Sequence, residues 1–375
     1  MSGKTAAFGV GSFHFAWEPP KGAKDQQPTV EQYVKAVTNA LNAIPTIKKV
    51  EIDHEEYVGD DLGVASPLPD WSEGEGFYPG FDYFKLTFEV FMPRRLQDEL
   101  LHKTDDAAGT ERFRIYQTYG YEAPVTFIRP LAPTGDHAPS TSVRLVRDYL
   151  KREFATSRDG ISFQCLGPSP LHADFFLRDN AQGLTPDYPF IATVETPAGY
   201  DQVEIWYDPN LHRSVEAAFD NLLFELTPQL SDCYAVYAGN ARAVNAWDVL
   251  SHDLDTLLNR GKVSRPRRIW RALWRGQALA KLHQTIAEFE ADAVDNANFI
   301  ERTRKQLVRS KPIIPLKPLL DVAVDDCERF ALRQVEKLVG HVEARRYNQL
   351  TLIVALAAAI IGGVVGAFIQ ARLAQ

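Results

Sequence analysis

The first two thirds of the chain alternate hydrophobic and polar positions in short runs. Alternation with period two predicts strands, and it occurs at residues 13–17, 50–58, 81–91, 113–119, 125–128, 161–166, 174–177, 203–207 and 233–237. Helical periodicity predicts helices at residues 29–44, 142–154 and 215–226, the first opening with the capping-box spacing of Thr29 and Gln32. The pattern predicts a mixed-sheet α/β (or α+β) domain over residues 1–240.

From residue 241 the periodicity changes to that of long helices. It predicts helices at residues 241–259 and 266–309, then a proline-rich break at 311–318. Residues 319–369 contain no proline and can form one helix, in which we expect an apolar seam. Its members are Val324, Cys327, Ala331, Val335, Leu338 and Val342. Residues 241–349 are therefore predicted to be a helical stalk region, with a break at Gly340 as the alternative, since glycine costs a helix about 1 kcal/mol.

An uncharged apolar run closes the sequence at residues 350–369. Roughly 20 apolar residues suffice to cross a bilayer as a helix, whereas buried helices of a protein core usually have shorter apolar runs. The run predicts a transmembrane helix at residues 350–370, followed by a short far-side tail at 371–375.

The charges beside this run predict an orientation. Lys337, Arg345 and Arg346 precede it and Arg372 follows it, which favours a cytoplasmic N-terminal side. The first residues show no signal-peptide pattern. We therefore expect a tail-anchored, single-pass membrane protein whose bulk is cytoplasmic and whose C-terminus lies across the membrane.

The closing run also predicts a partner helix. At 100° per residue, small side chains share one face of the helix, and such faces let helix backbones approach closely. The predicted packing face is Thr351, Ala355, Ala358, Ala359, Gly362 and Gly366. Asn348, Thr351 and Gln370 on the same stripe are possible pore-lining residues. We expect a homo-oligomer through this helix and the stalk, although glycine and alanine are also common in single spans.

The order of elements resembles that of the CorA family of divalent-cation channels. An α/β domain is followed by long helices and a stalk that enters the apolar run through the sequence Asn-Gln-Leu-Thr-Leu-Ile at 348–353. The Gly-Met-Asn motif of that family is absent, and no second apolar run follows. The resemblance implies that a folded domain controls an oligomer of stalk helices, and it transfers no filter or metal residue.

Composition and charge narrow the classes of partner. The 375 residues are 45% hydrophobic and 24% charged, which is typical of a folded protein, and the net charge of −8 disfavours nucleic-acid binding. Three widely spaced cysteines, Cys165, Cys233 and Cys327, indicate reduced thiols rather than a disulfide framework or a zinc site. No motif identifies a cofactor.

Residues 260–275 combine arginines and tryptophans on separate helix faces. Arg267, Arg271 and Arg275 form one row, and Trp270 and Trp274 lie on another face. This arrangement is typical of a lipid-facing interfacial helix. A solvated basic face with packed tryptophans is the interpretation we favour.

Two further groups of side chains suggest chemistry. Asp53, His54, Glu55 and Glu56, with Asp60 and Asp61, could attract a hard cation, although a solvated strand end explains them better. Cys165, His172 and Asp174 resemble a nucleophile, a base and an orienting acid, but cysteine in an apolar strand is usually a core residue. We assign no catalytic residue and no metal ligand.

Three functions remain open from the sequence. The first is a non-enzymatic sensor or effector whose α/β domain detects a ligand or protein partner and relays it through the stalk to an oligomerising helix. It would act as a scaffold or a pore, for instance in a bacterial stress or antiviral defence pathway. The second is a CorA-like divalent-cation channel, and the third is a membrane-anchored enzyme.

Overall fold

The computed structural model describes most of the chain in two compact units. The described residues are 5–18, 28–55, 83–101, 109–119, 123–134, 138–165, 171, 173–179, 184–185, 189–196, 201–259, 265–310, 313–314, 316 and 330–373. The side chains of residues 55, 83, 259, 265–275, 307–310 and 363–373 lie outside this description. The sheet unit comprises Met1–Arg242 and Phe299–Val324, and the helical unit comprises Ala243–Asn298 and Asp325–Gln375.

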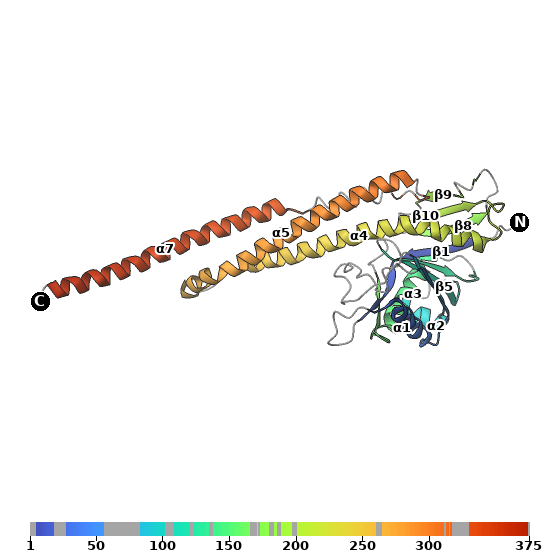
Figure 1. The fold of residues 1–375 in the computed structure, drawn as a ribbon, viewed down its shortest axis with the longest axis horizontal. Coiled ribbons are helices and arrows are strands. Elements are labelled where there is room, and N and C mark those ends of the chain that lie inside the picture. The colour runs from blue at the N-terminus through green and yellow to red at the C-terminus, as the bar shows by residue number, and fades with distance from the viewer. Residues whose placement is uncertain are drawn as a thin grey trace. The chain divides into compact units, whose positions relative to one another are not determined.

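The sheet unit is built on an eight-stranded mixed sheet with the order β3-β4-β5-β6-β1-β8-β10-β9. Figure 1 shows this sheet, with β1, β5, β8, β9 and β10 labelled. Its neighbouring strands pair antiparallel except β8 and β10, which are parallel. The strands are β1 (Thr5–Gly11), β3 (Ile47–Glu55), β4 (Tyr83–Phe91), β5 (Arg112–Tyr119), β6 (Val125–Pro130), β8 (Ala173–Asp179), β9 (Phe190–Glu195) and β10 (Asp201–Tyr207). The predicted mixed-sheet α/β architecture is therefore present.

One face of the β3-β4-β5-β6 half of the sheet is covered by helices and a second, two-stranded sheet. The covering elements are α1 (Val30–Asn42), α2 (Arg94–Leu101), α3 (Pro139–Glu153), β2 (Phe13–Trp17) and β7 (Ile161–Cys165). The predicted capping box is confirmed, because Thr29 and Gln32 satisfy each other's backbone N–H groups at the start of α1. Aromatic and aliphatic side chains of these elements form the main core of the unit.

Strand β2 pairs with β7 along one edge, and buried side chains bond its other edge. Tyr119 accepts a hydrogen bond from the Phe15 N–H at 2.9 Å, and the Tyr33 hydroxyl donates to the Phe15 carbonyl at 2.7 Å. Thr126 accepts from the Phe13 N–H at 3.2 Å. A buried polar group without a hydrogen-bond partner is costly. These bonds satisfy both the backbone groups of β2 and the polar side chains, so the polar side chains can lie inside the core.

The opposite face of the sheet is covered at its centre by the first turns of α4 (Val215–Asn259). Phe219 of α4 lies 5.2 Å from Phe8, which stacks on Phe175 at 5.1 Å. The predicted strand at residues 233–237 is wrong, because α4 runs through it. As part of the helix, Cys233, Tyr234 and Val236 are buried in the interior. This burial outweighs their preference for a strand.

The helical unit packs the second half of α4 against α5 (Arg265–Ser310) and α7 (Leu332–Leu373). Its apolar core contains Leu250, Leu257, Leu279, Leu282, Ile286, Val335 and Val339. Trp247, Phe289 and Phe330 close one region of it, with ring centroids 5.2–5.8 Å apart. Val335 and Val342 of the predicted seam do contact this core, whereas Leu338 is 42% exposed.

The predicted unbroken helix from residue 319 needs correction. Residues 330 and 331 are not helical, and α7 begins at Leu332, while residues 319–329, including Val324 and Cys327, lie outside the described residues. The alternative of a break at Gly340 is also wrong, because α7 continues through it. Residues 241–349 therefore include the second part of α4, the whole of α5 and the first part of α7.

The prediction of a membrane span is contradicted. In the part of the chain that the structure describes, no helix is long and apolar enough to cross a membrane. The predictions of a transmembrane helix at 350–370, a far-side tail at 371–375 and a tail-anchored, single-pass membrane location are corrected accordingly.

Candidate functional site

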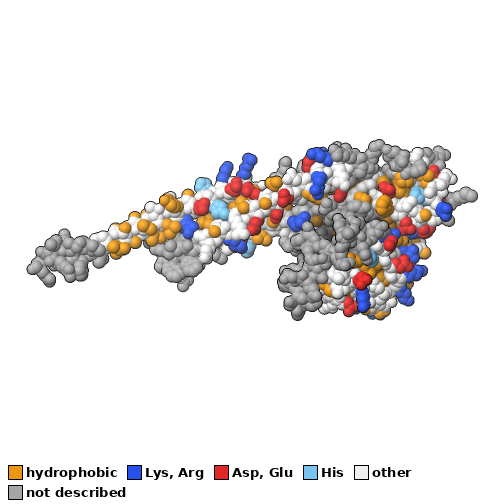
Figure 2. Space-filling view, in the orientation of Figure 1, with side chains coloured by type: hydrophobic (Ala, Val, Ile, Leu, Met, Phe, Trp, Pro, Cys, Tyr) orange, Lys and Arg blue, Asp and Glu red, His pale blue; other side chains and the backbone are white. Residues whose placement is uncertain are grey.

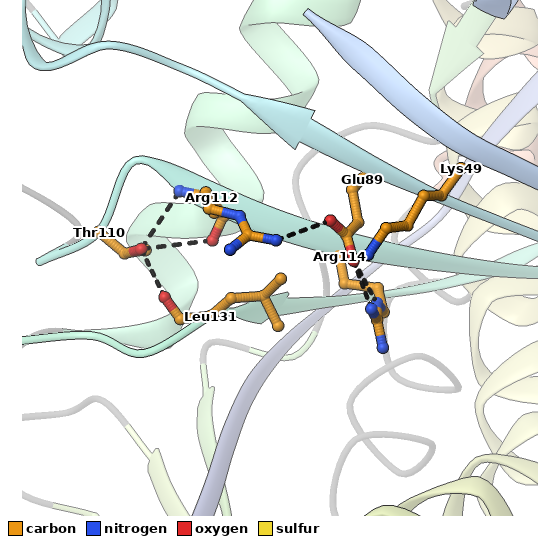
Figure 3. Close-up of polar contacts among 6 residues, drawn as sticks. All are labelled: Lys49, Glu89, Thr110, Arg112, Arg114 and Leu131. Carbon is orange, nitrogen blue, oxygen red and sulfur yellow. Dashed lines mark hydrogen bonds and ion pairs between the residues drawn. The ribbon is translucent and has the colours of Figure 1, made fainter.

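A carboxylate surrounded by three cationic side chains lies on the sheet face away from the main core (Figure 3). Glu89 of β4 accepts hydrogen bonds from Lys49 Nζ at 3.1 Å and from Arg112 Nη2 at 3.0 Å. Arg114 reaches the same carboxylate through Nη2 and through Nε, the latter at 3.1 Å. We call these four residues the Glu89 cluster.

Strand pairing explains why the cluster forms. Glu89 lies opposite Arg114 in the β4–β5 ladder, and Arg112 is two residues before Arg114 on the same face. The residues between them, Val90 and Phe113, point into the core and are buried. Alternation along two paired strands thus holds three charged side chains side by side.

Lys49 joins the cluster through an irregular backbone. The register of β3 against β4 shifts between Lys48 and Glu51, and Lys49 has a φ of 55°, in the left-handed region. Such a conformation costs a non-glycine residue about 1–3 kcal/mol and is concentrated at functional positions. The bulge aims the Lys49 ammonium at Glu89 of the neighbouring strand.

The electrostatics of the cluster fix its charge. Burial acts to raise the pKa of Glu89, but the hydrogen bonds from Arg114, Lys49 and Arg112 together outweigh burial and lower the pKa to about 2. The bond to Glu89 raises the pKa of Arg114. The carboxylate is therefore ionised near neutral pH, and three cations meet one anion.

The cluster combines a buried centre with an open rim. The Glu89 side chain is 10% exposed, whereas the Lys49 and Arg112 side chains are each 58% exposed. Thr110 holds the backbone at the start of β5 by donating to the Leu131 carbonyl at 2.6 Å and accepting from the Arg112 N–H at 3.2 Å (Figure 3). Arg112 is therefore anchored at its backbone, while its side chain bonds Glu89 and stays more than half exposed.

A second group of charges lies on the same sheet face where α4 begins. Arg129 pairs with Glu216 at 3.2 Å and lies over the Phe219 ring, and Lys85 pairs with Asp220 at 3.4 Å. Each of these cations has its own acidic partner on α4. Among the described residues of this face, Lys49, Arg112 and Arg114 instead share the single carboxylate of Glu89.

The other unusual surface is the end of α7. Leu352, Val354, Leu356, Ile360 and Ile361 are 57–66% exposed in a stretch without charged residues, residues 350–362, which we call the apolar segment. Figure 2 shows hydrophobic side chains, in orange, gathered on α7 beside its grey end. A helix that is apolar on every side normally lies buried, whereas the described large side chains of this segment are exposed in the single chain.

The structure describes part of the predicted packing face. Thr351, Ala355, Ala358, Ala359 and Gly362 are exposed on α7, whereas the side chains of Gly366 and Gln370 lie outside the described residues. Asn348 is also exposed, and the Thr351 hydroxyl donates to the Tyr347 carbonyl at 3.0 Å. A Cβ added at Gly362 would meet no atom within 4 Å.

Other predicted site residues are less informative. The side chains of Arg267, Trp270, Arg271, Trp274 and Arg275 lie outside the described residues. His172 lies outside them too, while Asp174 accepts a hydrogen bond from the Ser140 N–H at 2.8 Å and so caps the start of α3. Cys165 is half buried at the end of β7.

The predicted carboxylate group near the end of β3 is divided by the strand. Asp53 lies opposite Lys85 and His54 opposite Phe84, so their side chains point to different faces of the sheet. The side chain of Glu55, and Glu56, Asp60 and Asp61 entirely, lie outside the described residues. Among the described residues, no three His, Cys, Asp or Glu side chains are placed to hold a metal ion.

The sequence interpretation missed the Glu89 cluster. The alternation of Arg112, Phe113, Arg114 and Ile115 was a readable signal for two arginines on one face of a strand. Their meeting with Glu89 and Lys49 depends on strand pairing and on the bulge in β3. Neither can be read from local sequence.

The chain was compared with protein families, curated proteins and solved structures. No family model, no curated protein and no solved structure matches the chain. The function therefore has to be inferred from the geometry of the two units.

Proposed function

We propose that this protein is a non-enzymatic assembly protein in which copies associate through α7, while the sheet unit serves to detect a ligand or partner. The observation that carries the proposal is the exposed, uncharged apolar segment at the end of α7. Exposed apolar surfaces of this kind on a folded protein mark interaction sites. The occupant we propose is the same segment of further copies.

Continuity with the packing inside one chain supports a second copy as the occupant. Val335, Val339 and Val342 of α7 pack against α4 and α5 in the helical unit. The same helix continues as the apolar segment, where the described residues of the chain provide no comparable cover. An uncharged helix matches another uncharged helix without leaving a buried charge unpaired.

The distribution of side-chain sizes favours more than two copies. At 100° per residue, Leu352, Leu356 and Ile360 point to one side of α7, and Ile361 to the side opposite Leu352. The small residues from Thr351 to Gly362 occupy the remaining arc. The large side of one helix can pack on the small side of the next, and such head-to-tail contacts close into rings when the rotation permits.

Burial of the exposed side chains sets the size of the gain on association. Complete burial of one large aliphatic side chain contributes about 1.5–3 kcal/mol, and these side chains are already about a third covered. Each chain whose large side chains become buried between neighbouring copies therefore gains on the order of 5 kcal/mol. The gain adds up over several chains and is set against an association cost of about 4–15 kcal/mol. Additional copies raise the gain because each helix then has two neighbours.

Two glycines of α7 provide a matched test. A Cβ added at Gly362 or at Gly340 meets nothing within 4 Å, so leucine at either position fits the single chain and improves helix propensity by about 1 kcal/mol. Only at Gly362 would leucine obstruct the proposed helix–helix contact. Sedimentation velocity on the full chain should show Gly362→Leu shifted to the single-chain species and Gly340→Leu assembled like the parent.

The outcome decides the proposal. If Gly362→Leu assembles as the parent does, close packing on the small side of α7 is wrong. If both variants dissociate, the effect does not arise from the apolar segment, and the proposal is again contradicted.

A further inference from the structure

The Glu89 cluster carries more positive charge than its own carboxylate neutralises. Lys49, Arg112 and Arg114 all contact Glu89, so the four side chains together retain two positive charges. Nearby cations on the same face pair with Glu216 and Asp220 of α4 instead. A fold that needed only a stable ladder would be served by one Glu–Arg pair across β4 and β5.

The rim of the cluster has donors to spare. A guanidinium carries five N–H donors and an ammonium three. Arg112 contacts Glu89 through Nη2, and Lys49 contacts it through Nζ, while both side chains remain 58% exposed. Among the described side chains these contacts leave donors of both residues directed toward solvent, where a second anion can accept them.

The charge of the Glu89 cluster and the shape of its donors indicate which kind of anion it binds. We propose that the Glu89 cluster binds a phosphate monoester dianion, held by the Arg112 fork and the Lys49 ammonium, with Arg114 and Glu89 fixing their positions. A dianion neutralises both excess charges, whereas a carboxylate or sulfonate neutralises one. The planar guanidinium matches two phosphate oxygens at once, and the ammonium adds a point charge.

The backbone of β3 supports a binding role. Lys49 adopts φ 55° at a register shift, and this conformation brings its ammonium to the exposed rim beside Arg112. The strand would be relaxed if this residue followed the regular ladder. A strained residue that presents a charged, half-exposed group is typical of a ligand contact.

This binding site is independent of assembly through α7. The cluster lies within the sheet unit, and the apolar segment lies within the helical unit. The proposed phosphate ligand names the chemistry that the sheet unit would detect. Gly362→Leu should therefore bind the phosphate ester as the parent does, so that failure of one proposal leaves the other intact.

Calorimetric titration of the full chain with phenyl phosphate tests the proposal. At pH 7.5 and constant ionic strength, we expect saturable binding of phenyl phosphate and of inorganic phosphate, and binding of benzenesulfonate that is weaker by about tenfold or more. The difference follows from the second charge, because a charge-assisted contact commonly changes affinity by that factor. If phenyl phosphate binds and inorganic phosphate does not, the ring rather than the dianion is recognised, and the proposal fails.

Variants separate the site from general charge. Arg112→Gln and Lys49→Gln should each weaken phosphate binding at least about tenfold, and circular dichroism should confirm that the fold is kept. Arg95→Gln removes an equally positive side chain from α2 of the same unit, 92% exposed and paired with Glu99, and should leave binding unchanged. Any of three results would overturn the assignment. They are a loss of phosphate binding in Arg95→Gln equal to that in the cluster variants, undiminished phosphate binding in both cluster variants, or no saturable phosphate binding by the parent.

Discussion

Glu89→Gln should destabilise the sheet unit near neutral pH in a way that disappears in acid. The substitution keeps the size of the side chain and removes its charge, which leaves Lys49, Arg112 and Arg114 close together without a counter-charge. Like charges at this spacing repel, and the half-buried Arg114 loses its ionic partner. The parent and the variant therefore differ mainly in the electrostatics of one carboxylate.

The pKa of Glu89 sets the size of the expected loss of stability. Despite burial, the three cations lower it from 4.5 to about 2, and each pKa unit corresponds to about 1.4 kcal/mol. That gives an upper limit of about 3.5 kcal/mol, and we expect about 2 kcal/mol because Lys49 and Arg112 are more than half exposed to screening solvent. Since the folded-state pKa lies below the unfolded value, this stability is present above pH 4.5 and is lost as the pH falls toward 2.

Urea titration with hydrogen exchange measured by mass spectrometry reports the stability of β4 and β5 separately from the helical unit. Glu89→Gln should lower the urea midpoint of these strands at pH 7, and the difference from the parent should shrink at pH 3. Glu99→Gln, which removes a 56%-exposed carboxylate paired with Arg95, should cost less than about 1 kcal/mol at either pH. A loss in Glu89→Gln that is the same at pH 7 and pH 3 would show that the cations do not act through the charge of this carboxylate.

Two further predictions address the cores of the two units. Tyr119→Phe should lower the stability of the sheet unit by about 1–3 kcal/mol, because the Phe15 N–H would lose its buried acceptor. Urea denaturation followed by hydrogen exchange of β2 measures this loss of stability. Exchange in β2 that is unchanged from the parent would contradict the prediction. Leu282→Ala should lower the stability of the helical unit by about 2–5 kcal/mol, because Leu282 is 1% exposed in its core. Hydrogen exchange should become faster in α5 and α7 but not in β4. Exchange in α5 and α7 as slow as in the parent would show that this core does not hold the helices together.

Local patterns predicted the elements whose residues and neighbours agree. The alternation at 13–17 and the capping box at Thr29 gave β2 and the start of α1. Strand β1 was missed, because Gly9 and Gly11 weaken a strand pattern. A Cβ at Gly9 would lie 2.4 Å from Val143 Cγ2 of α3, so the close approach of helix and strand requires the residue that obscured the strand.

Tertiary burial decided the elements that were misassigned. Residues 233–237 contain aromatic and branched side chains that favour a strand, yet α4 continues through them because the helix buries them in the sheet unit. Pro228 lies within the same helix, although a proline in a helix interior removes a backbone hydrogen bond and costs about 3 kcal/mol or more. The packing around α4 outweighs both local preferences.

The candidate sites show the same division. The apolar character of residues 350–362 was evident from the sequence, whereas its interpretation as a membrane span was wrong. The Glu89 cluster depends on contacts between three strands and on the left-handed backbone of Lys49. Composition alone contains no such information.

The mass of the unmodified chain in solution tests the central claim most directly. Sedimentation equilibrium over a range of protein concentrations should give a mass of several chains, which decreases on dilution as the contacts through α7 dissociate. A mass of one chain at every concentration would contradict assembly through the apolar segment.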